Sequence, residues 1–272
     1  MRRKSLEARL RAAYSKGMNA LTAGLSPEIV LVCLGLAFLA GLVKGTVGFA
    51  MPMILISGLS MVIPPHLALA GLILPTVVSN WLQALRQGWR AAWDSARSFR
   101  MFLVIAGVAL AISAQFVTVL SQQAMMLAIG IPVAVFTLIQ LFGVRLHLRA
   151  RDRRIEAGVA VISGAIGGIA GTWGPPVVLY LTALDTEKRM HLRVQGVIYG
   201  LGGLALFAAH IGSGLLDSRT TPFSLLLVAP ALAGMWLGGM FADRIPQATF
   251  RRLTLLVLVV AALNLIRRGI MG

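Results

Sequence analysis

The sequence GLVKGTVG at residues 41–48 returns as GGIAGTWG at residues 167–174, each time inside an otherwise apolar segment. Proline follows both copies, as Pro52 after the first and as Pro175 and Pro176 after the second. Glycine and proline interrupt helices, and an interrupted helix exposes backbone N–H and C=O groups that lipid cannot satisfy. A pair of interrupted apolar segments at matching positions is typical of the binding site of a secondary transporter.

The composition indicates a membrane protein. Of 272 residues, 58% are hydrophobic and 12% are charged, which is about half the charged fraction of an average soluble domain. Apart from Lys44, the basic residues behind the net charge of +16 lie in loops and tails. In loops and tails, basic residues keep the segment on the cytoplasmic side of a membrane and contact anionic lipid. No motif supports nucleic-acid binding as another use of this charge.

Eight apolar segments predict an all-α, polytopic membrane protein. They run approximately over residues 29–62, 66–85, 101–120, 124–144, 157–183, 192–215, 222–241 and 250–266. A straight span needs about 20 residues, and six of the segments have ordinary spanning length. Segments 29–62 and 157–183 contain the breaks. We expect each of these two to form a helical hairpin of two short helices that meet at the glycines.

A second match extends the internal repeat beyond the glycines. The stretch from His66 to Gly71 resembles the stretch from His191 to Gly196, almost in register with the first match. This indicates a duplicated chain. A surface segment at residues 1–27 precedes the first membrane repeat at residues 28–145, and a basic linker at residues 146–154 joins that repeat to the second one at residues 155–272. The basic N-terminal segment lacks the apolar centre of a signal peptide, and we expect it at the membrane surface.

The charged loops predict the topology. If each hairpin returns to the side that it entered, three full spans follow in each half, and the halves have opposite orientations. The basic loops then share one face, the cytoplasmic face of the membrane; they are residues 86–100, 145–154, 188–193 and 244–252. Both termini fall on the outer face. In the alternative, segment 29–62 crosses completely and places the N-terminus inside.

The two interruptions also predict an anion site. A helix that begins at the membrane midplane points free N–H groups and the positive end of its dipole into the protein. Lys44 adds a full positive charge in the first copy, whereas Ala170 takes its place in the second, so the site is asymmetric. The expected backbone and hydroxyl donors belong to Gly45, Thr46, Gly48, Gly171, Thr172 and Gly174.

Further side chains are candidates for the same pathway. Trp173 either stacks over a substrate or serves in packing alone. Asn80, Gln83 and Gln195 are polar groups in apolar segments, and they either line the pathway or bridge helices. Lys44 itself has the alternative of reaching the membrane interface or pairing with a helix carbonyl. Close helix packing is expected of the remaining motif glycines, Gly41, Gly167 and Gly168.

Several kinds of chemistry have no carrier in the sequence. No Asp or Glu lies within a predicted span, so carboxylate-based proton or sodium coupling has no evident group. Cys33 is the only cysteine and no Cys/His cluster indicates a metal, so we expect neither a disulfide nor a cofactor. His210 is expected to be satisfied by packing rather than to carry a proton. No catalytic motif is present, and the sequence does not predict an enzyme.

The two motifs resemble those of the sulfite exporter TauE/SafE family of bacterial membrane permeases. That family has a glycine-rich motif ending in proline near the start of each of two four-segment halves. Here the motifs span Ala40 to Pro52 and Gly164 to Pro176, and the resemblance extends from about residue 28 to the end. It implies export or exchange of small sulfur-containing or other organic anions, such as sulfite, thiosulfate, sulfoacetate or other sulfonates.

The chain departs from the family pattern at two places. A run of glycines is usual where this chain has Gly48-Phe49-Ala50, and a small residue is more usual at Lys44. Both departures alter the size and charge of the site, and both allow a substrate other than sulfite.

The function predicted from these features is that of a secondary transporter, an exporter of small anions, which works by alternating access around a central site. Two alternatives are a passive anion channel and an importer of small carboxylates. A third is a membrane protein that transports nothing. This alternative does not explain why two helices are interrupted at matching positions. A small anion and membrane lipid are the expected partners. The oligomeric state is open, with a homodimer as one arrangement.

Overall fold

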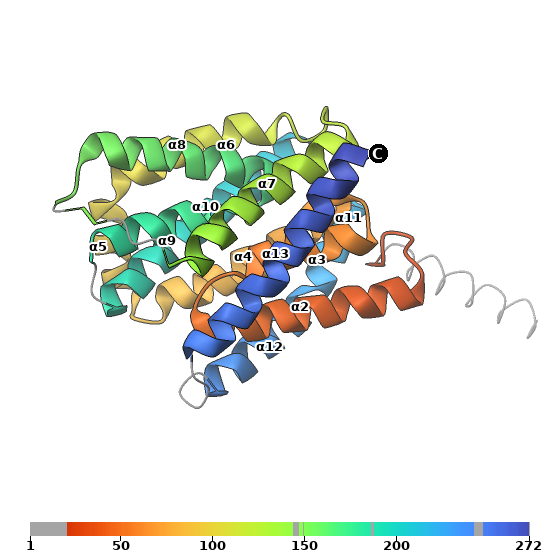
Figure 1. Ribbon diagram of the computed structural model, residues 1–272, viewed down its shortest axis with the longest axis horizontal. Helices are drawn as coiled ribbons and strands as arrows, with labels where there is room; N and C mark the ends of the chain where they lie inside the picture. The colour runs from red at the N-terminus through yellow and green to blue at the C-terminus, as the bar shows by residue number, and fades with distance from the viewer. Residues whose placement is uncertain (1–20, 144–146, 149, 186–187, 242–246, 272) are drawn as a thin grey trace, which may run out of the picture.

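The computed structural model describes residues 21–143, 147–148, 150–185, 188–241 and 247–271 (Figure 1). Within these residues the chain forms helices and no strand, which confirms the predicted all-helical class. The helices are α2 (Pro27–Val47), α3 (Met51–Val62), α4 (Pro65–Leu85), α5 (Trp89–Ser98), α6 (Arg100–Ala114), α7 (Gln122–Leu141), α8 (Arg153–Ala170), α9 (Gly174–Ala183), α10 (Lys188–Gly212), α11 (Thr220–Leu226), α12 (Val228–Phe241) and α13 (Gln247–Met271). Residues 1–20 of the predicted surface segment lie outside the described residues, as do residues 146 and 149 of the predicted linker.

Among the described residues, five helical stretches are long and apolar enough to cross a membrane. They are Pro27–Thr46, Pro65–Leu85, Gln122–Leu141, Arg193–Gly212 and Thr220–Met240. α5 and α6 make a sixth candidate if they count as one span, although the chain bends by 78° between them. The predicted uninterrupted span over residues 101–120 is wrong, because α6 has 15 residues and ends at Ala114. Its last turn tightens at Gln115, whose N–H bonds the Ile112 carbonyl at 3.2 Å.

Both interruptions end a long helix in the same way. α2 stops at Gly48, whose left-handed φ of 83° lets its N–H bond the Lys44 carbonyl at 2.8 Å. α8 stops at Gly171, with a φ of 64° and a bond of 2.8 Å to the Gly167 carbonyl. Glycine adopts this conformation without steric cost. Gly48 and Gly171 therefore fix where the two long helices end.

The helix after each break folds back along the helix before it. Gly58 in α3 faces the Leu36 side chain of α2, and the Tyr180 hydroxyl of α9 lies 3.4 Å from the Glu156 carboxylate near the start of α8. The hairpins do not, however, consist of two short helices each. α2 has 21 residues and α8 has 18, whereas α3 has 12 and α9 has 10. Gly45, although part of the first motif, lies within α2 and faces the backbone of α12.

Helices from the two predicted repeats pack on one another. α2 lies against α12, α6 against α8, α4 against α10, and α7 against α13 (Figure 1). Each pair joins an element of residues 28–145 to an element of residues 155–272, so the repeats share one packed core. The inverted relation between them stays a prediction.

Glycines allow the closest of these helix contacts. A Cβ on Gly41 would lie 1.9 Å from the Ala231 carbonyl oxygen, and one on Gly45 would lie 2.1 Å from that of Met235. Gly234 and Gly238 of α12 lie equally close to the backbone of α2, and Gly164 and Gly168 of α8 lie equally close to α6. Small residues stabilise helix pairs in membranes because the backbones approach closely. The packing role predicted for Gly41 is confirmed.

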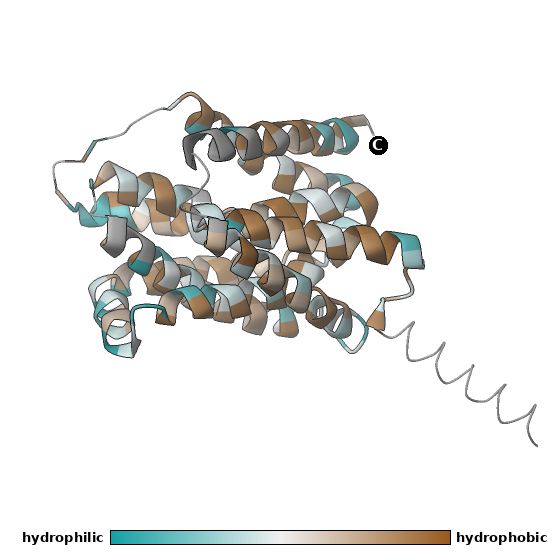
Figure 2. Ribbon diagram, turned by 90° about the horizontal axis from the view of Figure 1, so that it is seen from below, coloured by the Kyte–Doolittle hydropathy of each residue, from teal (hydrophilic) through white to brown (hydrophobic). Residues whose placement is uncertain are grey.

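The outside of the bundle suits lipid. Large apolar side chains, among them Leu31, Val108 and Trp236, are exposed on the helices. Figure 2 shows hydrophobic ribbon along the helices and hydrophilic ribbon largely near their ends. Such side chains are stable against hydrocarbon, and charged loops are stable at the two surfaces.

Three of the predicted cytoplasmic loops meet at one end of the bundle. Arg151 donates to the Ser98 carbonyl at 2.8 Å, and Arg193 donates to the Ser95 hydroxyl at 3.0 Å. Arg151 also pairs with Glu156 at 2.5 Å, and this hydrogen bond raises the pKa of the guanidinium above its ordinary value. This gathering is what the positive-inside prediction requires. Part of the fourth loop, residues 244–246, lies outside the described residues.

Candidate substrate site

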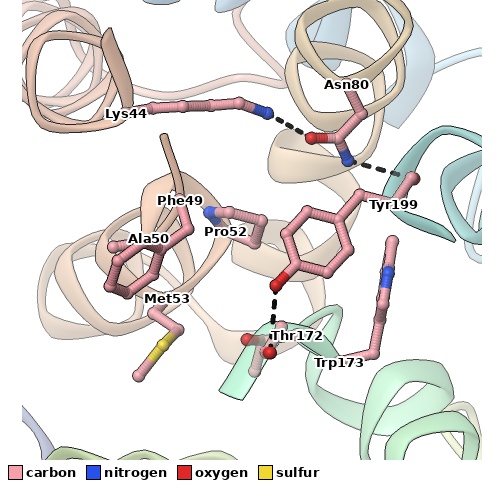
Figure 3. Close-up of a pocket in the computed structure, with 10 residues that line it drawn as sticks. Lys44, Phe49, Ala50, Pro52, Met53, Asn80, Thr172, Trp173 and Tyr199 are labelled. Atoms are coloured by element: carbon pink, nitrogen blue, oxygen red, sulfur yellow. Dashed lines mark hydrogen bonds between the residues drawn. The ribbon is translucent and has the colours of Figure 1, made fainter. Parts of the chain in front are cut away.

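A small cavity lies where the two interruptions meet (Figure 3). Its lining comes from α2, α3, α4, α9, α10 and the breaks, and consists of Lys44, Phe49, Ala50, Pro52, Met53, Asn80, Thr172, Trp173, Gly174 and Tyr199. The cavity has a volume of about 20 Å³, which is room for about one water molecule. A larger ligand therefore requires the lining elements to separate.

Lys44 enters this cavity from the last turn of α2. The residue is 3% exposed, and its Nζ donates to the Ser79 hydroxyl at 3.0 Å and to the side-chain oxygen of Asn80. Figure 3 shows the side chain extending toward Asn80. The carbonyl end of a helix favours a cation, so α2 supports Lys44 in part. The alternatives considered from the sequence, the membrane interface and a helix carbonyl, are wrong.

No carboxylate pairs with Lys44 among the residues that the structure describes. The one ion pair found there joins Arg151 to Glu156, at the end of the bundle where the basic loops meet. A buried charge without a counter-ion is unfavourable by several kcal/mol. Two neutral oxygens offset only part of that cost, so a charged Lys44 leaves the site short of one negative charge.

Asn80 links the two halves of the molecule at the cavity. Its Nδ2 donates to the Tyr199 backbone carbonyl at 3.1 Å, which leaves Oδ1 to accept from Lys44. Ser79, the preceding residue on α4, lies with its hydroxyl 3.4 Å from the Met51 sulfur. Other contacts therefore position both acceptors that serve Lys44.

An aromatic pair from the second half forms another wall. Trp173 and Tyr199 pack edge to face, with ring centroids 6.4 Å apart and an angle of 82° between the planes. The Tyr199 hydroxyl donates to the Gly174 carbonyl at 3.0 Å and accepts from Gln195 Nε2 at 2.9 Å. A Cβ on Gly174 would lie 2.9 Å from that hydroxyl. A side chain at this position would therefore displace the Tyr199 hydroxyl.

The Trp173 indole N–H is a buried donor. Trp173 is 5% exposed, and its Nε1 has no hydrogen-bond partner within the described part of the chain. An unpaired buried donor costs about 1–3 kcal/mol. Such groups call for an explanation, and an absent water or ligand is one of the common ones.

Both short helices begin at the cavity. α3 starts at Met51 and α9 starts at Gly174, so the positive ends of two helix dipoles lie close to the same space. The prolines limit what these ends can donate, since Pro52, Pro175 and Pro176 have no N–H. Side chains must therefore supply more of the polar contacts than the two breaks alone suggest.

A family comparison decides the class of protein. A family model described as Sulfite exporter TauE/SafE matches residues 33–265, a stretch that contains both interruptions and every residue of the cavity. The chain belongs to the sulfite exporter TauE/SafE family. Comparisons with curated proteins and with solved structures found no match. Membership of TauE/SafE, together with the apolar helices, makes the chain a multi-pass membrane permease.

Both departures from the usual TauE/SafE motif lie at the cavity. Lys44 supplies the one charge-bearing group of its lining. Ala50, where a run of glycines is more usual, has a left-handed φ of 77°. This conformation costs a residue with a Cβ about 1–2 kcal/mol. The departures therefore change the charge of the site and strain its backbone.

The cavity contains only part of the site predicted from the sequence. It brings together Lys44, Asn80, Thr172, Trp173 and Gly174. The other candidates do not line it; they are Gly45, Thr46, Gly48, Gly171, Gln83 and Gln195.

The three remaining candidates of the first motif have roles within the fold. Gly45 faces α12, because the Met235 backbone occupies the space beside it. The Thr46 hydroxyl donates back to the Leu42 carbonyl at 2.8 Å, as threonine in a helix commonly does. Gly48 forms the helix cap.

The remaining candidates of the second half and of α4 also lie outside the cavity lining. Gly171 caps α8 and faces the Leu72 side chain. Gln195 holds the Tyr199 hydroxyl. Gln83 follows Asn80 by about one turn of α4, and its Nε2 finds no partner within the described residues.

Sequence reasoning missed Ser79 and Tyr199. Helical spacing could have found Tyr199, which follows Gln195 by about one turn, whereas Ser79 is adjacent to Asn80 and has no such signal. Pro52, which follows the first interruption, also lines the cavity. The rest of the lining, Phe49, Ala50 and Met53, gives no polar signal in the sequence.

Other titratable groups do not enter the cavity. His210 is fully buried, with its ring nitrogens 3.0 Å from the Gly168 carbonyl and 3.2 Å from the Ser213 hydroxyl. The packing role predicted for His210 is confirmed. Within the described residues, no group of three or more His, Cys, Asp or Glu side chains is placed to hold a metal.

Proposed function

We propose that this permease is a secondary transporter that exports small sulfur-containing or organic anions, such as sulfite, sulfoacetate or other sulfonates, across the bacterial inner membrane. The observation that carries the proposal is the buried Lys44, which has no carboxylate partner among the described residues and faces a space where two helices begin. A small oxyanion would supply both the missing negative charge and acceptors for the N–H and O–H groups nearby.

Alternating access fits this geometry better than a passive channel. A channel needs a continuous water-filled path, whereas the space beside Lys44 has room for about one water molecule. The Asn80 side chain bonds across the two halves at the cavity. Opening the site to either surface would break that bond or move one half against the other, as in transporters built from two repeats.

Reconstituted protein provides the test. Liposomes loaded with sulfite or sulfoacetate should take up the labelled anion by counterflow, and Lys44→Met should abolish the uptake while the variant still folds. Arg90→Met is the matched control, because it removes an exposed arginine from α5 and should transport normally. Thermal stability measured against sulfite, thiosulfate, sulfoacetate and matched carboxylates would identify the preferred class. Absence of counterflow with every anion would refute the proposal.

A further inference from the structure

As an ammonium, Lys44 has one more N–H donor than there are acceptors bonded to it. An ammonium carries three N–H groups, whereas a neutral amine carries two N–H groups and a lone pair. The Ser79 hydroxyl and the Asn80 side-chain oxygen accept two hydrogen bonds from Nζ. Among the described residues, no third acceptor bonds Nζ. The empty site therefore matches the neutral amine, and the third N–H of the ammonium is left facing the cavity.

Within the described part of the chain, the neighbouring helices place no carboxylate beside Lys44 that would hold the proton in the empty site. α3 and α12 contain no ionisable residue. On α4 the one ionisable side chain is His66, at the first turn, where it contacts the Val117 carbonyl. α10 presents the Tyr199 hydroxyl, which bonds the Gly174 carbonyl and Gln195. α13 also touches α2, and its described ionisable residues are Arg252, Arg267 and Arg268, the last of which donates to the Ser60 carbonyl.

We propose that Lys44 binds the anion and a proton together, an inference that rests on the proposed function. The neutral amine takes up one proton as the anion enters, and the third N–H then bonds an anion oxygen. When the anion leaves, the ammonium returns the proton to water. In each cycle one N–H bond forms and one breaks, the proton comes from water on one side and goes to water on the other, and nothing is oxidised or reduced.

The charge balance follows from this scheme. One anion and one proton move together, so the loaded site is neutral overall and the empty site is neutral as well. Export then runs down the gradient of the anion and carries one proton outward with each anion. Neither state places a net charge in the membrane interior, where charge is costly. The scheme also gives proton coupling a carrier. The buried carboxylate among the described residues, Glu156, is already paired with Arg151 at the end of the bundle.

Binding of the anion and binding of the proton must then strengthen each other, because coupling between two ligands is reciprocal. The apparent affinity for a permanently ionised anion should fall by about tenfold for each unit of rising pH over the range in which the empty amine is neutral. Sulfite itself changes protonation near neutral pH and would obscure this dependence. Methanesulfonate stays ionised, and it is the probe of choice.

The experiment measures protons and anions on the same sample. Purified protein in a weakly buffered, mildly alkaline solution without sulfonate buffers is mixed with methanesulfonate, and a pH electrode records the protons taken up. Titration calorimetry records the anion bound. Wild-type protein should take up about one proton per anion. Lys44→Arg carries a permanent charge, so it should bind the anion with no proton uptake and with an affinity independent of pH.

Transport in liposomes gives a second readout that needs no variant. Methanesulfonate entry should be driven by an acidic outside solution, and it should not respond to a membrane potential imposed with potassium and valinomycin. Binding or counterflow without proton uptake, or entry that follows the membrane potential, would overturn the proton coupling and leave the proposed transport intact. Absence of binding and counterflow for sulfite, sulfoacetate and methanesulfonate alike would refute the proposed function and the coupling with it.

Discussion

Replacing Gly45 by alanine tests how the site is held in place. Gly45 directly follows Lys44 on α2 and faces α12. An alanine Cβ would lie 2.1 Å from the Met235 carbonyl oxygen and 2.8 Å from the Gly239 nitrogen. Both are backbone atoms on one helix, so no side-chain rotation can relieve the contact. α2 and α12 must move apart.

The size of the movement sets the size of the effect. Cβ atoms essentially never come within 3.0 Å of another heavy atom, so the helices must separate by at least 0.9 Å, which is 3.0 minus 2.1. A gap of 0.5–1 Å removes about a quarter to a half of the dispersion energy of each contact. In a membrane this packing is the main force between helices. Overpacking of this kind costs about 1–3 kcal/mol, which corresponds to a fall in Tm of roughly 2–12 °C.

Thermal unfolding of the detergent-purified protein measures this effect. Gly35→Ala is the matched control, because Gly35 also lies on α2 but no atom lies within 4 Å of its would-be Cβ. Alanine favours the helix over glycine by about 1 kcal/mol, so the control should keep or raise the Tm. Gly45→Ala should also weaken anion binding, since the movement displaces Lys44 from Asn80. Equal Tm values for the two variants would refute the packing argument.

Three further substitutions test the cavity. Asn80→Asp puts a carboxylate beside Lys44, so anion binding measured by calorimetry should be lost without a fall in Tm; retained binding would contradict the need for an external anion. Trp173→Phe keeps a ring but removes the unpaired N–H, and it should lower methanesulfonate affinity by about 2- to 10-fold, the worth of one hydrogen bond; equal affinities would show that this N–H does not bind the anion. Ala50→Gly relieves a left-handed alanine and should raise the Tm by the equivalent of about 1 kcal/mol, whereas Ala37→Gly inside α2 should lower it; a lower Tm for Ala50→Gly would refute the strain.

The interruptions could be predicted because they depend on local chemistry. Gly48 and Gly171 end helices through their own backbone conformation, and a proline follows each break. What the sequence could not give is which glycines end a helix and which ones pack. Gly45 and Gly48 are three residues apart and look alike in the sequence. Only the position of α12 distinguishes them, and that contact joins segments about 190 residues apart.

The cavity was harder to predict for the same reason. Lys44 could be identified, because a lysine inside an apolar run is costly wherever it points. Its partners could not, since Ser79 and Asn80 meet it only when α4 packs beside α2 and α3. Thr46 was predicted to offer its hydroxyl to a ligand, which requires that hydroxyl to be free. In a helix, a threonine hydroxyl readily bonds the carbonyl one turn earlier, and here it does so at Leu42.

The asymmetry of the site suggests how an anion would lie in it. The ammonium and its two acceptors, Lys44, Ser79 and Asn80, all come from the first half. Their counterparts at the matching offsets in the second half are apolar, namely Ala170, Leu204 and Ala205. The second half contributes an aromatic wall instead, from Trp173 and Tyr199. A sulfonate bound here would therefore direct its charged oxygens toward the first half and its carbon chain toward the aromatic rings. The aromatic wall would then select the length and bulk of the carbon chain of the substrate, whereas Lys44 would select its charge.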